Sequence, residues 1–423
     1  MLEDRVSQQV RGQQKALPLS DSAGRGIYYW PFSDVEHERR WCRLHDLMDA
    51  EGLAGVVLYG SRATGSWPIF YLSNWIPTRD TYLIVPRHGP ATLVVQLQNH
   101  VQCATDMAVL DDVRYGGRDR RGQPDSIPTV VGITRERGLG EQEVGLVGSP
   151  TMDVMRRLEQ DLPGVRWRSV GGRFSAMTSR KSEEEVARLR RAAAVTDAAL
   201  EALRDGLRPG MTERDVAGLL EHGCRQAGGE FGIRHLMTTS MRAPDCGVPA
   251  QYPSDRPVGV GDVVVVELSG KWANYSAQAL RTFAVGTSLS EDFRRLHDVA
   301  QQAFDRIEAV LRAGASVADV HGAADVIEAS GFTIIDDLLH GANQSRPIVR
   351  TRAASDGVDT GFTFESGMAV VIQPNVATLD QRAGVQFGEM LVVRDDGVER
   401  LHGLERGAFE HVGAATSVEA GQA

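Results

Sequence analysis

The spacing of apolar and polar residues differs between the two halves of the chain. In the first half, a helical pattern begins at Val35 and is closed by Gly52. Short apolar runs follow, separated by helical or loop segments: AGVVLYG, TYLIVP, ATLVVQL and EVGLVG. Such alternation predicts an α/β domain over residues 35–176. Residues 1–34 lack hydrophobic periodicity and are predicted to form an extended N-terminal arm.

The second half, residues 177–423, shows paired helices and antiparallel-type strands. Four pairs of a hydroxyl and an acid three residues later predict helix starts, because each side chain satisfies an orphan amide: Ser182/Glu185, Thr212/Asp215, Ser288/Glu291 and Ser316/Asp319. Strands are predicted over 263–269, 275–285, 368–374 and 386–394. This order favours an α+β domain over a parallel sheet.

Composition narrows the classes of partner. The net charge is −10 and basic residues form no long run, which argues against nucleic acid. No apolar run reaches the ~20 residues of a membrane helix, and the polar N-terminus is unlike a secretory signal. Four scattered cysteines fit reduced thiols, so a cytoplasmic protein is expected. Its Ala-, Arg- and Gly-rich composition suggests a bacterial source, where such relatives serve specialised metabolism.

Several motifs carry a resemblance to a known family. They include TSRKSEEEVARLRRAAAVTDAALEAL, LRPGMTERDVA, PSDRPVGVGDVVVVELSG, YSAQALRTFAVG, GMAVVIQPNV and GVQFGEMLVVRDDG. From Ser179 to Arg406 the chain resembles the creatinase/aminopeptidase P/methionine aminopeptidase family, peptidase M24. The resemblance implies a pita-bread C-terminal domain, preceded in the sequence by a smaller α/β, creatinase-type N-terminal domain. It also implies a homodimer, in which the small domain reaches into the partner's pocket.

Peptidases of this family bind two divalent metal ions through two aspartates, one histidine and two glutamates. By motif, these ligand positions fall on Glu267, Gln278, His340, Gln373 and Gly388. Neutral amides and a glycine leave two cations without compensating charge, which is strongly unfavourable in a buried pocket. We therefore predict no dinuclear metal site and no cofactor.

One alternative keeps a metal. Glu389 follows Gly388 directly, and a one-residue slip would make a weak mononuclear site from Glu267, His340 and Glu389. Three ligands of this kind are the minimum for a catalytic metal centre.

Creatinase works without metal, and the chain matches it in part. The two creatinase arginines that hold the substrate carboxylate correspond to Arg79 and Arg350, which suit bidentate binding unless they only form surface ion pairs. The creatinase base maps to Ala250, or to Gln251 with a slip. Its guanidinium-binding glutamates map to Leu280 and Gln373. The guanidine-specific residues are therefore missing.

The retained polar residues suggest a neutral pocket around one histidine. His340 is the candidate acid–base, and Glu267 the carboxylate that orients it. The alternative is an inherited histidine that only hydrogen-bonds in the core. The remaining candidates are predicted to line the substrate pocket: Gln278, Gln373, Asn375, Tyr252, Tyr275 and Trp75.

Three functions follow in order of preference. The first is a metal-independent enzyme that hydrolyses or eliminates at a C–N bond of a small carboxylated substrate. The second is a non-catalytic descendant that binds a ligand in the old pocket. The third is an Xaa-Pro aminopeptidase or dipeptidase-like metallohydrolase with atypical ligands.

Overall fold

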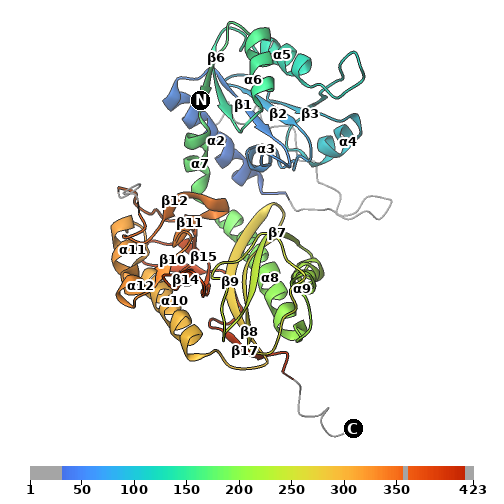
Figure 1. Ribbon diagram of the computed structural model, residues 1–423. Helices are drawn as coiled ribbons and strands as arrows, with labels where there is room; N and C mark the ends of the chain where they lie inside the picture. Colours follow the sequence, from blue (N-terminus) through green and yellow to red (C-terminus); the bar gives the residue numbers. More distant parts are fainter. Residues whose placement is uncertain (1–30, 356–360, 415–423) are drawn as a thin grey trace. The chain divides into compact units, whose positions relative to one another are not determined.

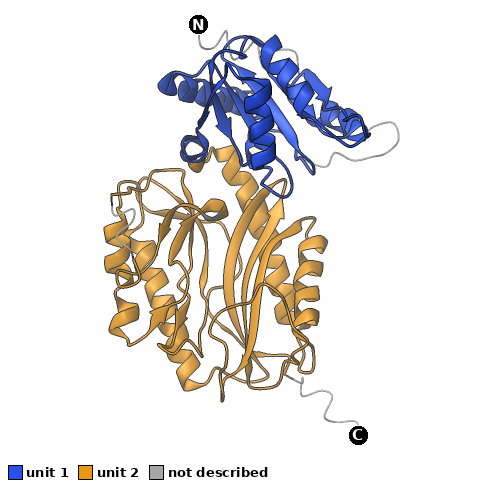
Figure 2. Ribbon diagram, turned by 45° about the horizontal axis from the view of Figure 1, so that its top comes forward, with its two compact units in different colours: residues 1–178 blue, residues 179–423 orange. Residues whose placement is uncertain are grey.

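The computed structural model of the chain describes residues 31–355 and 361–414. The chain divides into two compact units, Met1–Thr178 and Ser179–Ala423 (Figure 2). The predicted arm at residues 1–34 lies outside the described residues except for its last few positions. Over the described ranges, no helix is both long and apolar enough to span a membrane.

Unit 1 contains a six-stranded mixed sheet in the order β4-β3-β2-β1-β5-β6. The strands are β1 (Gly55–Gly60), β2 (Thr81–Pro86), β3 (Thr92–Val95), β4 (Asp112–Tyr115), β5 (Glu143–Val147) and β6 (Arg166–Ser169). The helices are α2 (Asp34–Glu51), α3 (Trp67–Ser73), α4 (Gln98–Met107), α5 (Ile127–Glu136), α6 (Met152–Asp161) and α7 (Gly171–Ser179). As predicted, Gly52 ends the first helix in a left-handed conformation that suits glycine.

Unit 2 is organised around a nine-stranded sheet, whose main path runs β12-β11-β13-β15-β9-β8-β7. These strands are β7 (Glu230–Ser240), β8 (Asp262–Trp272), β9 (Tyr275–Val285), β11 (Leu339–Gly341), β12 (Ser345–Val349), β13 (Ala369–Ile372) and β15 (Gly388–Val393). Strands β16 (Val398–Arg400) and β17 (Phe409–Val412) pair with β15 and β9. A separate short pair joins β10 (Thr333–Ile334) to β14 (Val376–Ala377).

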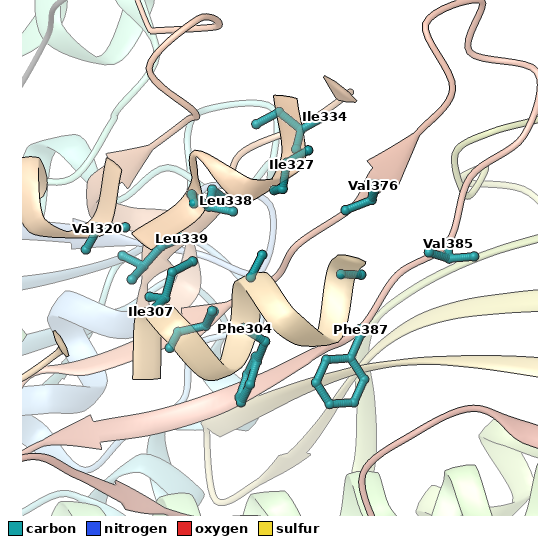
Figure 3. Close-up of a cluster of buried hydrophobic side chains, with 14 of the residues drawn as sticks. Phe304, Ile307, Val320, Ile327, Ile334, Leu338, Leu339, Val376, Val385 and Phe387 are labelled. Atoms are coloured by element: carbon teal, nitrogen blue, oxygen red, sulfur yellow. The ribbon is translucent and has the colours of Figure 1, made fainter. Parts of the chain in front are cut away.

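The helices of unit 2 form two groups beside this sheet (Figure 1). Helices α8 (Glu183–Gly206) and α9 (Glu213–Gln226) pack against β7, β8 and β9. Helix α10 (Glu291–Val310) packs against β13 and β14, with α11 (Val317–Ala324) and α12 (Val326–Ala329) beside it; a short 3₁₀ helix, η1 (Ala342–Gln344), follows β11. Figure 3 shows the apolar cluster under α10, where Phe304 and Ile307 meet Leu339 and Phe387.

Three of the four predicted helix caps are confirmed. Ser182, Thr212 and Ser316 each accept from the backbone three residues on, and each forms a complete capping box. The prediction for the helix near residue 290 is wrong by two residues. Ser290 caps α10 by accepting from the Phe293 amide, and the Ser288 hydroxyl bonds the His411 ring instead.

Candidate active site

The β8–β9 hairpin positions the first two candidate residues. A two-residue turn, Ala273-Asn274, joins the strands with both residues at positive φ, as in a type I′ turn. This turn fixes the register, so that Glu267 lies opposite Leu280 and Ser269 lies opposite Gln278. Because side chains alternate between faces, Glu267 and Gln278 lie on the same face of the sheet.

The neighbouring strands add further residues to that face. His235 of β7 lies opposite Glu267, and Gly388 of β15 lies opposite Leu280. Two positions further along β15, Met390 lies opposite Val371, which is the partner of His340. The sheet register therefore brings His235, Glu267, Gln278 and His340 to one face from widely separated parts of the sequence.

A buried chain of hydrogen bonds connects the glutamines to two carboxylates. The Gln278 amide donates to Glu267 Oε1 at 2.9 Å and to Gln373 Oε1 at 3.0 Å. The Gln373 amide in turn donates to Asp337 Oδ1 at 2.9 Å. Gln386 donates to the other Glu267 oxygen at 3.3 Å. We call these five residues the amide–carboxylate chain; each is buried.

Burial raises the pKa of both acids of the amide–carboxylate chain, Glu267 and Asp337. Removal from water raises the pKa of Glu267, against the opposing effect of the Gln386 hydrogen bond. Burial also raises the pKa of Asp337 to about 6, although the charge of His340 acts in the opposite direction. Both carboxyls therefore interact electrostatically with His340 and hold a proton more tightly than exposed acids do.

His340 is 1% exposed and has a defined orientation. Its Nδ1 lies 2.7 Å from the carbonyl oxygen of Gly341. Since a carbonyl only accepts, Nδ1 carries the proton and donates, and Nε2 of the neutral ring has the lone pair. Among the described residues, His340 Nε2 and Gln386 Oε1 are both buried without a hydrogen-bond partner. Buried polar atoms of this kind are costly unless a bound molecule satisfies them.

A cavity of about 200 Å³ lies beside Gln278. Ser269, Lys271 and Ser276 of the hairpin line it, and Asn343 and Met390 close it from other elements. All three hairpin residues lie on the same face as Glu267. The pair Ser269–Gln278 is two positions along the hairpin from the pair Glu267–Leu280, and the pair Lys271–Ser276 is four positions along. The amide–carboxylate chain therefore has a small cavity next to it.

Glu389 does not supply a ligand on this face. It lies opposite Ala279, one residue out of step with Gly388, so its side chain is on the other side of the sheet. There it accepts from Arg281, Arg400 and Arg406. Burial favours its protonation, but the Arg400 hydrogen bond and the arginine charges outweigh this and lower the pKa to about 2. The slip that would bring Glu389 into the site is therefore contradicted by the strand register.

Gly388 itself leaves no room for a ligand. A Cβ atom at this position would lie 2.2 Å from the Ile372 carbonyl oxygen and 2.8 Å from Gln373 Cα. The close approach of β15 to Gln373 thus depends on the absence of a side chain at Gly388.

Three residues predicted to line the pocket are placed elsewhere. Tyr275 is on the opposite face of the hairpin, where its hydroxyl donates to Glu185 of α8 at 3.0 Å. Tyr252 is 83% exposed in the segment between β7 and β8. Trp75 belongs to unit 1 and is packed in its hydrophobic core. These positions are corrections to the predicted pocket, and the first follows from strand alternation.

Asn375 and the two arginines have other surroundings. Asn375 Oδ1 accepts from the Ile335 and Asp336 amides, and its amide donates to the Asp337 carbonyl, so it holds the segment that carries Asp337. Arg350 is exposed and donates to the Ile335 carbonyl at 3.2 Å. Arg79 is an exposed residue of unit 1.

The residues present do not fit a dinuclear metal centre. At the family's five ligand positions stand one carboxylate, one imidazole, two amides and a glycine, and both amides are engaged in the hydrogen-bonded chain. Over residues 31–355 and 361–414, no three His, Cys, Asp or Glu side chains are grouped so as to hold a metal ion. Neutral amides do not offset the charge of two divalent cations.

Comparison with known proteins agrees with the fold and the sequence motifs. Residues 187–395 match the model of metallopeptidase family M24. The Xaa-Pro dipeptidase of Pyrococcus furiosus is 22% identical over 341 residues, covering 80% of this chain and 91% of that protein. An uncharacterized hydrolase/peptidase of Sinorhizobium fredii is 28% identical over 217 residues, 50% of this chain and 55% of its own.

Solved structures show the same architecture. An Xaa-Pro dipeptidase from Bacillus anthracis superposes with a TM-score of 0.74 at 20% identity, over 88% of this chain and 99% of that chain. The X-Pro aminopeptidase from Thermotoga maritima gives 0.73 at 20% identity, over 87% and 98%. The chain belongs to metallopeptidase family M24. It has the pita-bread fold, which follows an N-terminal domain in the sequence.

Sequence reasoning missed three residues of the site. Asp337 precedes His340 by three residues but lies outside any strand, so no alternation places its side chain. His235 is identified only by its register against Glu267. Gln386 could have been found from the sequence. It stands two residues before Gly388, so in an extended segment both positions lie on the same face of the sheet.

Proposed function

We propose that the chain is a metal-independent, creatinase-like enzyme that breaks a C–N bond of a small carboxylated substrate, with His340 as the acid–base. The observation that carries the proposal is the buried, unpartnered Nε2 of His340, whose lone pair is fixed by the Nδ1–H bond to Gly341. A neutral imidazole held in this tautomer is suited to accept a proton.

The chemistry can be assigned to groups of this chain. In hydrolysis, His340 Nε2 takes a proton from water as the water oxygen bonds to the carbon, and it returns that proton to the leaving nitrogen. In elimination, Nε2 instead takes the proton from the carbon next to the C–N bond, a C=C bond forms as the C–N bond breaks, and Nε2 gives the proton to the leaving nitrogen. Glu267 favours the imidazolium that forms, because its carboxylate interacts with His340 electrostatically.

The pattern of acceptors supports a nitrogen-bearing reactive end. His340 Nε2 and Gln386 Oε1 both accept, and both lack a partner among the described residues. Glu267 adds a carboxylate beside Gln386, and it interacts electrostatically with His340. A substrate group with N–H donors satisfies this set, whereas a carboxylate there meets only acceptors. We propose Arg350 and Arg79 as the binding groups for the substrate carboxylate.

The proposal is tested with protein treated with a chelator and a panel of small carboxylated amides, amines and guanidines. For any substrate that turns over, His340→Gln is expected to lower kcat by about 10²–10⁴-fold, the range of general acid–base catalysis. The control is His222→Gln, an exposed histidine on α9, which should leave kcat unchanged.

Two results would contradict the proposal. Unchanged turnover in His340→Gln with unchanged folding removes the acid–base role. Ligand binding without turnover by the chelated wild type favours a non-catalytic descendant of the fold.

A further inference from the structure

A second pocket in unit 2 shares no residue with the amide–carboxylate chain. It has a volume of about 420 Å³, within the usual range for small-molecule sites. Three arginines from different elements line it: Arg242 follows β7, Arg295 lies on α10, and Arg382 lies between β14 and β15. We call it the arginine pocket.

These arginines make no salt bridge within the described part of the chain, and the charge of Arg382 interacts with the Asp380 carboxylate only at longer range. Across residues 31–355 and 361–414, none of the three guanidinium groups forms a salt bridge or a side-chain hydrogen bond to an acid. Arg295 instead lies over the Phe332 ring, 5.6 Å from its centre. Guanidinium groups with free donors suit planar or tetrahedral oxyanions.

Two acids also line the pocket, and they limit the charge of its ligand. Asp380 is turned back on its own loop, where its carboxylate accepts from the Thr378 hydroxyl at 2.6 Å and from the Arg382 amide. Asp292 lies in the first turn of α10. Three cations against two anions leave one net positive charge, which matches a monoanion better than a highly charged ligand.

The rest of the lining is apolar. Met241 and Phe332, which are half-buried, form the accessible apolar wall, and Phe293 and Leu296 of α10 lie beneath it with buried side chains. An inorganic anion would leave this surface in contact with water, whereas an organic ligand would cover it.

We propose that the arginine pocket is a second ligand site, for a small organic oxyanion with an apolar body. The carboxylates and the phosphate esters of aromatic or aliphatic groups share this chemistry. The guanidinium groups hold the oxyanion, and the wall formed by Met241 and Phe332 holds the apolar body. This site is independent of the proposed activity.

The test is calorimetric titration of the full chain with benzoate, phenyl phosphate and inorganic phosphate. At least one aryl anion should bind saturably at one site, about tenfold more tightly than inorganic phosphate. The double variant Arg295→Gln/Arg382→Gln should weaken that binding about tenfold or more. Arg306→Gln is the matched control, because Arg306 is an exposed arginine on the same helix outside the pocket, and it should leave binding unchanged.

Several results would overturn the proposal. They are absence of saturable binding by both aryl anions, equal affinity for inorganic phosphate, or an equal loss in Arg306→Gln. Loss of binding in His340→Gln would also overturn it, because the anion would then occupy the candidate active site. Preference between benzoate and phenyl phosphate decides which oxyanion the site takes.

Discussion

Gln278 and Gln373 keep the hydrogen-bonding shape of a carboxylate cluster without its charge. Gln278 donates to Glu267 and to Gln373, and Gln373 donates to Asp337, so the two side chains connect Glu267 to Asp337. The resemblance to the family's ligand motifs was enough to bring Glu267, Gln278, Gln373 and His340 together, because those motifs keep their places in the shared fold. Asp337 could not be predicted, since its position depends on an irregular segment.

Gly388→Ala should destabilise the protein. The added methyl group would lie 2.2 Å from the Ile372 carbonyl oxygen, which is backbone and cannot move alone. The expected loss in free energy of unfolding is about 1–3 kcal/mol, the usual cost of overpacking. Gly218→Ala is the control, because nothing lies within 4 Å of its Cβ position on α9; it should gain about 0.5–1 kcal/mol. Urea denaturation measures both, and equal effects would contradict the close packing at Gly388.

Asp337→Asn should change how stability depends on pH. The folded-state pKa of Asp337 is raised to about 6, so the folded chain binds this proton more tightly than the unfolded chain. Its contribution to stability is therefore fully present below about pH 4 and lost as the pH rises through about 6. Asparagine keeps the acceptor for Gln373 but cannot ionise. Relative to the wild type, the variant should gain stability across this window in urea titrations. Parallel curves would show that burial does not raise this pKa.

Among the secondary-structure elements, the strands of unit 2 were the most predictable. The pattern placed strands at 263–269 and 275–285, and the structure has β8 over Asp262–Trp272 and β9 over Tyr275–Val285. The predicted cap of α10 was two residues off because Ser288 and Ser290 both precede the same acid, Glu291. Backbone geometry decides between them: Ser290 has the extended conformation of an N-cap.

Ser290→Ala should lower the stability of the protein by about 1 kcal/mol, because the Phe293 amide loses its side-chain acceptor at the start of α10. Ser288→Ala removes a hydroxyl two residues earlier, where it bonds the exposed His411 ring and the Glu410 carboxylate near the surface. Its effect should be close to zero. Thermal denaturation of both variants gives the comparison, and a larger loss in Ser288→Ala would place the cap where the sequence pattern put it.

The strand register also explains the role of Glu389. On the face away from the site, it neutralises Arg281, which is fully buried, and it bonds Arg400 and Arg406 at the same time. A carboxylate with three cationic partners has a structural function, because removing it would leave a buried charge without a partner. A motif alone does not show this; the alternation of side chains along β15 does.

At the scale of the whole molecule, the family motifs lie in unit 2, and the fold there matches that of proteins only about one-fifth identical in sequence. The fold could therefore be predicted from sequence, since it depends on apolar spacing, caps and turns that tolerate many replacements. The site changed at the ligand positions while the sheet that presents them was retained. A homodimer, and the part that Arg79 has in it, stays a prediction from the family resemblance.

The central claim is that the amide–carboxylate chain has replaced the family's metal centre, and metal content tests it most directly. The purified chain is dialysed against excess Mn²⁺ or Zn²⁺, then against buffer, and analysed for bound metal. The account predicts less than about a tenth of an ion per chain, because Gln278, Gln373 and Gly388 cannot balance divalent charge. About two tightly bound ions per chain, as in a dinuclear hydrolase, would contradict it.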